Sequence, residues 1–112
     1  MAGPLEGIRV VDLTQVVSGP LATMLLADQG AEVVKVEPLG IGGDVTRLPS
    51  FAKAGISALF VNNNRGKRSL AVDLTKEEGK QIVIDLVEQA DVFIQNFRPG
   101  AIERLGLSYD EL

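Results

Sequence analysis

The sequence contains no cysteine and no histidine, and each absence removes a class of chemistry. Without cysteine the chain has no disulfides, no thiolate nucleophile and no cysteine-ligated metal. Without histidine its 112 residues cannot build a Ser-His-Asp triad or a histidine-ligated zinc site. Any chemistry must therefore come from carboxylates, amines or hydroxyls, and we expect no metal site.

Long apolar runs and an excess of positive charge are missing as well. The apolar runs are far shorter than the roughly 20 residues that span a bilayer. Residues 1–7 lack the basic start and apolar core of a secretory signal. The formal net charge of −4 argues against a general nucleic-acid surface. We therefore expect a cytoplasmic protein whose partners are neither a membrane nor a nucleic acid.

What the sequence does contain is an alternation of strand and helix patterns. Short β-branched runs predict four strands, the first of them central, at residues 8–13, 32–36, 69–73 and 91–95. Helices are predicted at residues 21–29, 75–89 and 101–105. The period of residues 57–61 fits a helix or a strand, and a short helix is the favoured interpretation. Because a strand–helix–strand crossover is almost always right-handed, the strands should be parallel. The pattern indicates an α/β fold with a parallel sheet and flanking helices.

Capping residues mark several of the predicted helix ends. Ser18 is placed to cap the first helix, and Gly30 follows its end. Thr75 and Glu78 have the spacing of a capping box at the start of a later helix. Residues 39–56 are punctuated by glycines and show no period, so we interpret them as a mobile or ligand-facing loop.

The last residues carry the signal for the start of a helix, but too few residues follow to form one. Ser108 and Glu111 have the spacing of another capping box, and only one residue follows them. We therefore expect the natural chain to continue, and residues 1–112 to be the N-terminal segment of a truncated domain.

Candidate ligand contacts lie where the predicted strands end, because open parallel sheets bind ligands beyond their carboxyl ends. Residues 14–19 lead into a helix N-terminus, which either binds a phosphate or carboxylate or forms an ordinary capped loop. Glu37 ends the second strand, where dinucleotide enzymes hold a ribose hydroxyl. Since the Gly-x-Gly-x-x-Gly fingerprint is absent, a solvated carboxylate is the favoured interpretation of Glu37.

Cations and polar side chains give further candidates. Arg65, Lys67 and Arg68 either receive a phosphate or form a solvated run beside a strand. Asn96 either reads a polar edge of a ligand or caps its turn, and Phe97 either stacks on a base or packs on the core.

Three more charged residues receive a specific interpretation. Arg98 and Arg104 lie on either side of a short predicted helix, where they are well placed for a pyrophosphate. Asp12 lies on the first strand, and a salt bridge or a hydrogen bond to the backbone is its expected role.

Several blocks of sequence gain their meaning when they are taken together and in order. The blocks are Pro4-Leu-x-Gly-Ile-x-Val-Val-Asp-Leu13, Gly19-Pro20, Leu26-Ala-Asp-Gln-Gly-Ala-Glu-Val-Val-Lys-Val-Glu37, Asn64-Arg-Gly-Lys-Arg-Ser-Leu-x-Val-Asp-Leu74, Asp91-Val-Phe-Ile-Gln-Asn-Phe-Arg-Pro-Gly100 and Leu105-Gly-Leu107. Together they resemble the class III CoA-transferases. The family includes formyl-CoA transferase, carnitine CoA-transferase and α-methylacyl-CoA racemase. Ordered blocks that cover nearly the whole chain are far more specific than any single motif.

The resemblance implies a Rossmann-like domain whose N-terminal part binds CoA. By matching positions, the resemblance assigns Val16 to the CoA moiety, Val72 and Thr75 to the adenine, Asn96, Phe97 and Arg98 to the CoA groove, and Arg104 to the phosphates. One position departs from the family: many relatives carry arginine after the acid that ends the second strand, and here that residue is Pro38. Two alternatives follow: adenine binding is weaker, or Arg47 or Lys53 substitutes for the missing arginine.

The resemblance also implies how the whole enzyme works. Family transferases use an aspartate nucleophile, which lies beyond position 112, so the chain contains no catalytic residue and alone should be inactive. The substrates are an acyl-CoA and a small carboxylic acid, with CoA as substrate rather than as a tightly bound cofactor. The full-length protein should form an intertwined homodimer. The alternatives are a racemase of the same family and a non-catalytic nucleotide-binding module.

Overall fold

The computed structural model describes residues 3–40, 42–48 and 52–112. In chain order its elements are β1 (Arg9–Asp12), α1 (Ser18–Asp28), β2 (Glu32–Pro38), the 3-10 helix η1 (Val45–Arg47), α2 (Ala58–Asn64), β3 (Arg68–Val72), α3 (Glu77–Glu88), β4 (Val92–Ile94) and α4 (Ala101–Arg104). Each predicted strand and helix is present, including the short helix near residue 60, and the boundaries differ by a few residues. No helix in the described ranges is long and apolar enough to cross a membrane.

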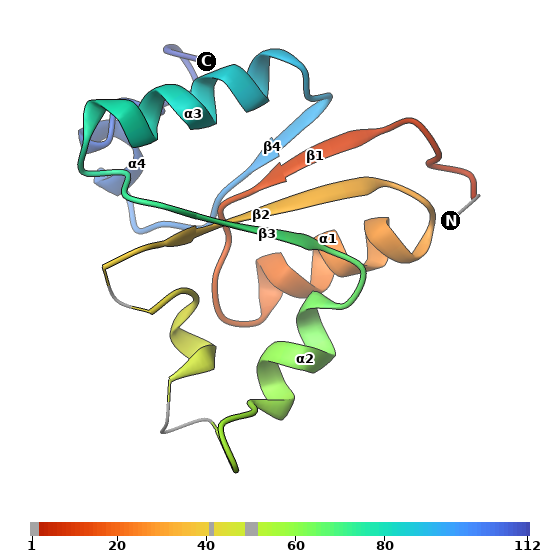
Figure 1. The fold of residues 1–112 in the computed structure, drawn as a ribbon. Helices are drawn as coiled ribbons and strands as arrows, with labels where there is room; N and C mark the ends of the chain where they lie inside the picture. Colours follow the sequence, from red (N-terminus) through yellow and green to blue (C-terminus); the bar gives the residue numbers. More distant parts are fainter. Residues whose placement is uncertain (1–2, 41, 49–51) are drawn as a thin grey trace.

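The four strands form one parallel sheet in the order β3-β2-β1-β4, as Figure 1 shows. β1 lies between β2 and β4, which confirms the prediction that the first strand is central. Val11 in β1 is in register with Val34 in β2 and with Phe93 in β4. The carboxyl ends of all four strands consequently point to the same edge of the sheet.

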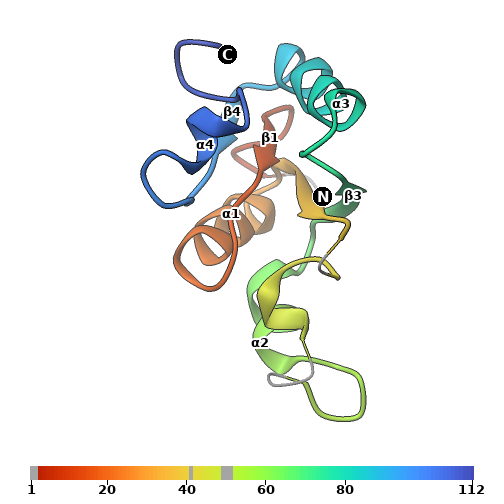
Figure 2. The same cartoon turned by 90° about the vertical axis from the view of Figure 1, so that its left-hand side faces the viewer.

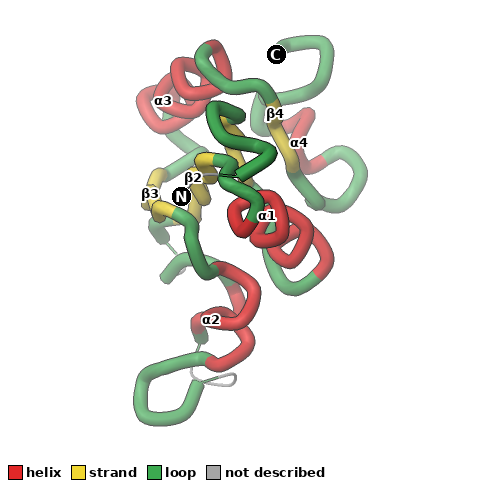
Figure 3. The backbone as a smooth tube through the Cα atoms, turned by 90° about the vertical axis from the view of Figure 1, so that its right-hand side faces the viewer, coloured by secondary structure: helices red, strands yellow, loops and turns green. Residues whose placement is uncertain are grey.

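Helices cover both faces of the sheet, which explains why its strands are rich in valine. α3 lies on one side and α1 on the other, with α2 and η1 further out on the side of α1 (Figures 1 and 2). Val11 and Val36 belong to the apolar cluster under α3, together with Val83 of that helix. Val10 and Val33 face the opposite way, into a smaller cluster with Leu26 and Ala27 of α1. In Figure 3 the yellow strands lie between these two red helices.

The helix ends correct two capping predictions. Gly30 ends α1 as predicted: it has a φ of 102°, and its N–H and that of Ala31 donate to carbonyls of the last helical turn. Ser18, however, is the first residue of α1 and not its cap, because the N–H of Leu21 already donates to the carbonyl of Val17. The prediction of a capping box at Thr75 and Glu78 is also wrong, because the hydroxyl of Thr75 donates to Asp73 and α3 begins only at Glu77.

The glycine-rich loop after β2 has more structure than its sequence suggests. Within it Asp44 caps η1, accepting from the N–H of Thr46 at 2.9 Å. Position 41 and positions 49–51, which the loop prediction included, lie outside the described residues. Near the other end of the chain, Ser108 Oγ donates to Glu111 Oε1 at 3.2 Å within a turn.

Candidate functional site

The loop between β1 and α1 carries Val16 and is held at its start by Asp12. The side chain of Asp12 is fully buried, and its Oδ1 accepts from the N–H of Thr14 at 2.8 Å and from the Thr14 hydroxyl. Gly19 lets α1 pack closely on this loop, because a Cβ at position 19 would overlap the Thr14 side chain. The loop therefore leaves the sheet in one fixed direction.

Asn96 follows β4, the neighbouring strand, and its side chain binds the same loop. The N–H of Gln15 donates to Asn96 Oδ1 at 3.0 Å, and Asn96 Nδ2 donates to the Gln15 carbonyl at 2.8 Å. From the sheet, Lys35 Nζ donates to the Thr14 carbonyl at 3.0 Å. The structure thus brings Val16 and Asn96, two of the predicted contacts, to one loop.

Val16 has an unusual backbone within this loop. Its φ is 76°, in the left-handed region, and its exposed fraction is 47%. The left-handed region is a genuine outlier for a β-branched residue. Strained residues of this kind cluster at ligand-binding sites.

A cavity of about 390 Å³ opens where β3 ends, and two other predicted contacts line it. Thr75 lies on one side, before α3, and Arg104 on the other, at the end of α4. The remaining charged residues of the lining are Lys76, Glu77, Lys80 and Glu103. Three cations against two carboxylates give this cavity a local positive charge, although the chain as a whole is acidic.

The position of Thr75 in the lining of this cavity is fixed by the turn at the end of β3. The N–H and hydroxyl of Thr75 donate to Asp73 Oδ1 at 3.0 and 2.5 Å. The hydroxyl bond is the larger cause that holds the pKa of Asp73 below its usual value, followed by the N–H bond. Gly79 brings α3 against the Asp73 carbonyl, because a Cβ at position 79 would overlap that oxygen.

The other three predicted contacts lie at the same edge of the sheet but outside this cavity. Val72 is the last residue of β3, is 4% exposed and is in register with Pro38. Phe97 packs against the apolar cluster under α3, which favours the core interpretation of this ring. Arg98 is exposed, and its carbonyl accepts from the N–H of Ala101.

Under the β1–α1 loop, a buried lysine joins the helices to β1. Lys67 Nζ lies 3.0 Å from Asp12 Oδ2 and donates to the Pro20 carbonyl and to Asn64 Oδ1, with only 2% of its side chain exposed. The hydroxyl of Thr23 also donates to Asp12 Oδ2, at 2.6 Å. The predicted salt bridge of Asp12 is therefore confirmed. Burial lowers the pKa of Lys67, against the opposing effect of the Asp12 carboxylate.

A second buried lysine, Lys35, pairs with the loop after β2. Its Nζ lies 2.8 Å from Asp44 Oδ2, and both side chains are almost completely buried. No described group meets Asp44 Oδ2 with hydrogen-bond geometry, so the ion pair alone compensates this oxygen. Burial would raise the pKa of Asp44, but Lys35 and the N–H and hydroxyl of Thr46 hold it below its usual value.

Glu37 is the third buried acid, and the prediction that it is solvated is wrong. It is 3% exposed, because the chain folds back after β2 and Arg47 binds both of its oxygens, at 2.7 and 3.0 Å. Burial would raise the pKa of Glu37, but Arg47, the Ser69 hydroxyl and the Asp44 N–H together lower it. The Arg47 guanidinium also stacks 3.6 Å above the Phe60 ring, so the residue expected to replace the arginine missing at position 38 has partners within the chain.

The basic stretch before β3 is exposed to solvent at its two arginines and buried at Lys67, and all three cations pair with carboxylates of the chain. Arg65 lies 2.7 Å from Asp28, Arg68 pairs with Glu32, and Lys67 is buried against Asp12. Only the two arginines keep more than half of their side chains exposed. These pairs leave the cavity beside Thr75 as the better candidate for binding phosphate.

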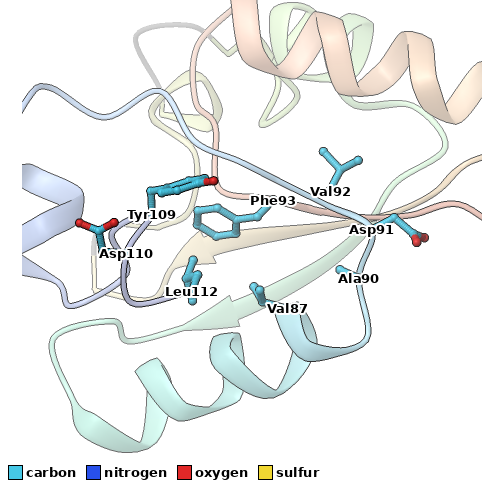
Figure 4. A pocket seen from close by; sticks show the side chains of 8 residues that line it. All are labelled: Val87, Ala90, Asp91, Val92, Phe93, Tyr109, Asp110 and Leu112. Atoms are coloured by element: carbon cyan, nitrogen blue, oxygen red, sulfur yellow. The ribbon is translucent and has the colours of Figure 1, made fainter.

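A larger cavity, of about 610 Å³, lies elsewhere and has a different character (Figure 4). It opens beside the exposed edge of β4, and Val87, Val92, Phe93 and Leu112 contribute apolar surface. The charged residues of its lining are Asp91 and Asp110, which would repel an anion. In the described ranges, no cluster of acidic residues could hold a metal ion.

Sequence reasoning missed the buried lysines, although a signal for Lys35 was present. Lys35 occupies the same face of β2 as Val33, and side chains two residues apart on a strand share a face. A charge on the inward face of a buried parallel strand requires a buried partner. The pattern does not identify that partner, because Asp44 lies in a loop without a period.

Comparison with known proteins gives one consistent family. The model of CoA-transferase family III matches residues 5–112. The probable fatty acyl-CoA transferase Rv3272 of Mycobacterium tuberculosis is 48% identical over 99% of this chain and 28% of its own length. The succinyl-CoA:mesaconate CoA-transferase of Haloarcula hispanica is 47% identical over 98% of this chain and 28% of its own length.

Solved structures agree with these sequence matches. The orthorhombic crystal form of Rv3272 superposes with a TM-score of 0.88 at 48% identity, covering 98% of this chain and 30% of that one. A CAIB/BAIF family protein from Brucella suis gives a TM-score of 0.87 at 41% identity, covering 99% of this chain and 30% of that one. The chain thus spans less than a third of the length of these relatives.

Proposed function

Because the chain belongs to CoA-transferase family III, we propose that it is the CoA-binding part of an enzyme that moves CoA from an acyl-CoA to a carboxylic acid. Its relatives carry names such as succinyl-CoA:mesaconate and acetyl-CoA:oxalate CoA-transferase, each of which pairs a CoA thioester with a carboxylic acid. CoA and its thioesters are substrates in this proposal, and no tightly bound cofactor takes part.

The cavity between α3 and α4 is the observation that carries the proposal. CoA is anionic through its phosphates, and this cavity combines Lys76, Lys80 and Arg104 at the carboxyl edge of the sheet. A guanidinium can bind a phosphate through two parallel hydrogen bonds, which suits Arg104 to this role. Thr75, opposite Arg104, would contact the adenine.

From this cavity the CoA arm would extend along the carboxyl edge towards the loops after β1 and β4. Asn96 follows β4 and binds the β1–α1 loop, which carries Val16. In this proposal Val16, Phe97 and Arg98 contact further parts of CoA, and Val72 lies with Thr75 near the adenine.

The proposed reaction uses an aspartate that lies outside these 112 residues. Its carboxylate attacks the thioester carbonyl of the donor, and the C–S bond breaks to give a mixed anhydride and CoA thiolate. The thiolate attacks the aspartyl carbonyl, which releases the donor as a carboxylate and leaves an aspartyl-CoA thioester. The acceptor carboxylate then attacks the aspartyl thioester carbonyl, and the C–S bond breaks to give a second anhydride and CoA thiolate. The thiolate attacks the acceptor carbonyl of this anhydride, which forms the acceptor CoA thioester and regenerates the aspartate.

Three further parts belong to the same proposal. The whole protein forms an intertwined homodimer, it acts in the cytoplasm, and the 112 residues alone bind CoA without turnover. A racemase of the same family would use the same CoA site with different residues at the reacting carbon. Assaying the whole protein for CoA transfer to dicarboxylates and for racemisation of α-methylacyl-CoA separates these two activities.

Titration calorimetry with coenzyme A tests the site. Arg104→Ala should weaken CoA binding by about tenfold or more, because a charge-assisted hydrogen bond to phosphate is lost. The affinity of this variant should also depend less on salt, since one ion pair fewer is screened.

Arg65→Ala is the matched control, because Arg65 pairs with Asp28 on the surface, away from the cavity. We expect it to bind CoA as the unchanged protein does. Equal affinities for the Arg104 variant and the unchanged protein would remove Arg104 from the site.

A further inference from the structure

The β1–α1 loop holds a backbone conformation that its own sequence does not favour. Val16 has a φ of 76°, a region that L-residues avoid because Cβ comes too close to the following carbonyl oxygen. For a β-branched residue the penalty is not relieved by a local side-chain hydrogen bond, as it can be for asparagine. Such a conformation persists only where the surrounding structure over-determines it.

Hydrogen bonds hold the loop at the residues that precede Val16. Asn96 binds the N–H and the carbonyl of Gln15, at 3.0 and 2.8 Å. Because one partner is a donor and the other an acceptor, these bonds also fix which end of the amide is oxygen. Lys35 Nζ holds the Thr14 carbonyl, and the N–H of Val45 donates to Gln15 Oε1 at 3.2 Å.

We propose that Asn96 is a positioning residue that keeps the Gln15–Val16 backbone in its left-handed turn, ready for CoA. This inference rests on the proposed function, in which Val16 contacts CoA. Asn96 acts through Gln15: without its two bonds the peptide on the N-terminal side of Val16 rotates, and φ of Val16 returns to the favoured negative range. The apparent affinity for CoA is then reduced in proportion to the fraction of molecules whose loop keeps the binding-competent conformation.

The loop conformation can be measured without any ligand. In the full-length protein, valine-selective isotope labels report φ of Val16 through scalar couplings. We expect a positive φ in the unchanged protein and a negative φ in the Asn96→Ala variant. The N–H of Gln15 should also exchange with solvent faster in that variant, because its acceptor is gone. A positive φ for Val16 in the Asn96→Ala variant would overturn the proposal.

A double-mutant cycle separates positioning from direct contact. Glycine adopts a positive φ without strain, so Val16→Gly makes the turn independent of the two hydrogen bonds of Asn96. We expect Asn96→Ala to raise the dissociation constant of coenzyme A by about fivefold to thirtyfold when Val16 is present. In the Val16→Gly background the same change should have a clearly smaller effect.

Each outcome decides one claim. An equal effect of Asn96→Ala in both backgrounds would mean that Asn96 contacts CoA directly, and it would overturn the positioning role. No CoA binding by the unchanged protein would contradict the proposed function. The φ of Val16 in the Asn96→Ala variant would then decide by itself whether Asn96 holds the turn. Gln81→Ala is the control for loss of an amide, because its side chain binds Asp85 on the surface of α3.

Discussion

On the face of the sheet that α3 and α4 cover, the buried side chains are apolar, whereas under α1, α2 and η1 they include two lysines and three carboxylates. The change occurs along single strands. On that second face β1 presents Val10 and then Asp12, and β2 presents Val33, then Lys35 and Glu37. The charges lie towards the carboxyl ends, where the loops of the candidate site leave the sheet.

The difference shows how this fold fixes loops and not only a core. Apolar burial is not directional, so the face under α3 tolerates small shifts of its helices. Each buried charge needs a partner at hydrogen-bonding distance. Lys35 and Lys67 accordingly hold the loop after β2 and the start of α1 at defined positions, and Lys35 also binds the β1–α1 loop.

Removing a charge from the polar face should have the largest effect on stability. Lys35→Met keeps most of the apolar stem but leaves Asp44 as a buried, unpaired carboxylate. We expect the free energy of unfolding to fall by about 3–5 kcal/mol. Urea unfolding measures this change.

Its control is the double variant Lys35→Met with Asp44→Asn, in which no buried charge of this pair lacks a partner. The amide oxygen introduced at position 44 would still accept from Thr46, so the double variant should recover most of the lost stability. If the double variant were less stable than Lys35→Met alone, the pairing account of this face would be wrong.

Truncating the apolar face should have a comparable but less specific effect. Leu107 is 1% exposed and belongs to the cluster under α3, so Leu107→Ala should lower the free energy of unfolding by about 2–5 kcal/mol. Leu39→Ala is the matched control, because Leu39 is 60% exposed, and we expect a change below about 0.5 kcal/mol. Equal losses for the two variants would contradict the assignment of the core.

The smallest difference between the faces should appear on acidification. The folded-state pKa values of Glu37 and Asp44 lie below their ordinary values of 4.5 and 3.8. The stability that these carboxylates contribute is therefore complete above pH 4.5 and is lost as the pH falls through their lowered pKa values.

In Glu37→Gln, stability should fall less steeply as the pH is lowered into the acidic range. Leu107→Ala should lower stability equally at every pH, so that the slope of stability against pH does not change. Thermal unfolding at a series of pH values from neutral to acidic separates these two patterns. A fall in stability as steep in Glu37→Gln as in the unchanged protein would remove Glu37 from this role.

The sheet could be predicted from the sequence because its signals are local. Runs such as residues 32–36 are β-branched and bounded by turn residues, and Gly30 marks the end of a helix. The two wrong helix-cap predictions, at Ser18 and Thr75, also rest on local signals. A capping sequence identifies a residue type that can cap a helix, but the side chain can form its hydrogen bond with another partner. For Thr75 that partner is Asp73, two residues earlier.

The contacts that shape the candidate site are not local, and the sequence alone does not reveal them. Asn96 binds Gln15 across 81 positions, and Lys67 meets Asp12 across 55. The left-handed φ of Val16 contradicts the preference of its own residue type, so no propensity predicts it. The roles of Val16, Val72, Thr75, Asn96, Phe97, Arg98 and Arg104 towards CoA stay predictions that rest on the family resemblance.

Amide hydrogen exchange with and without coenzyme A tests the central claim, that CoA binds along the carboxyl edge of this sheet. CoA should slow exchange in the β1–α1 loop, in the turn around Thr75 and between residues 96 and 104, and should leave the carboxyl half of α3 unchanged. Slower exchange confined to residues around the cavity of Figure 4, beside Phe93 and Tyr109, would contradict this site.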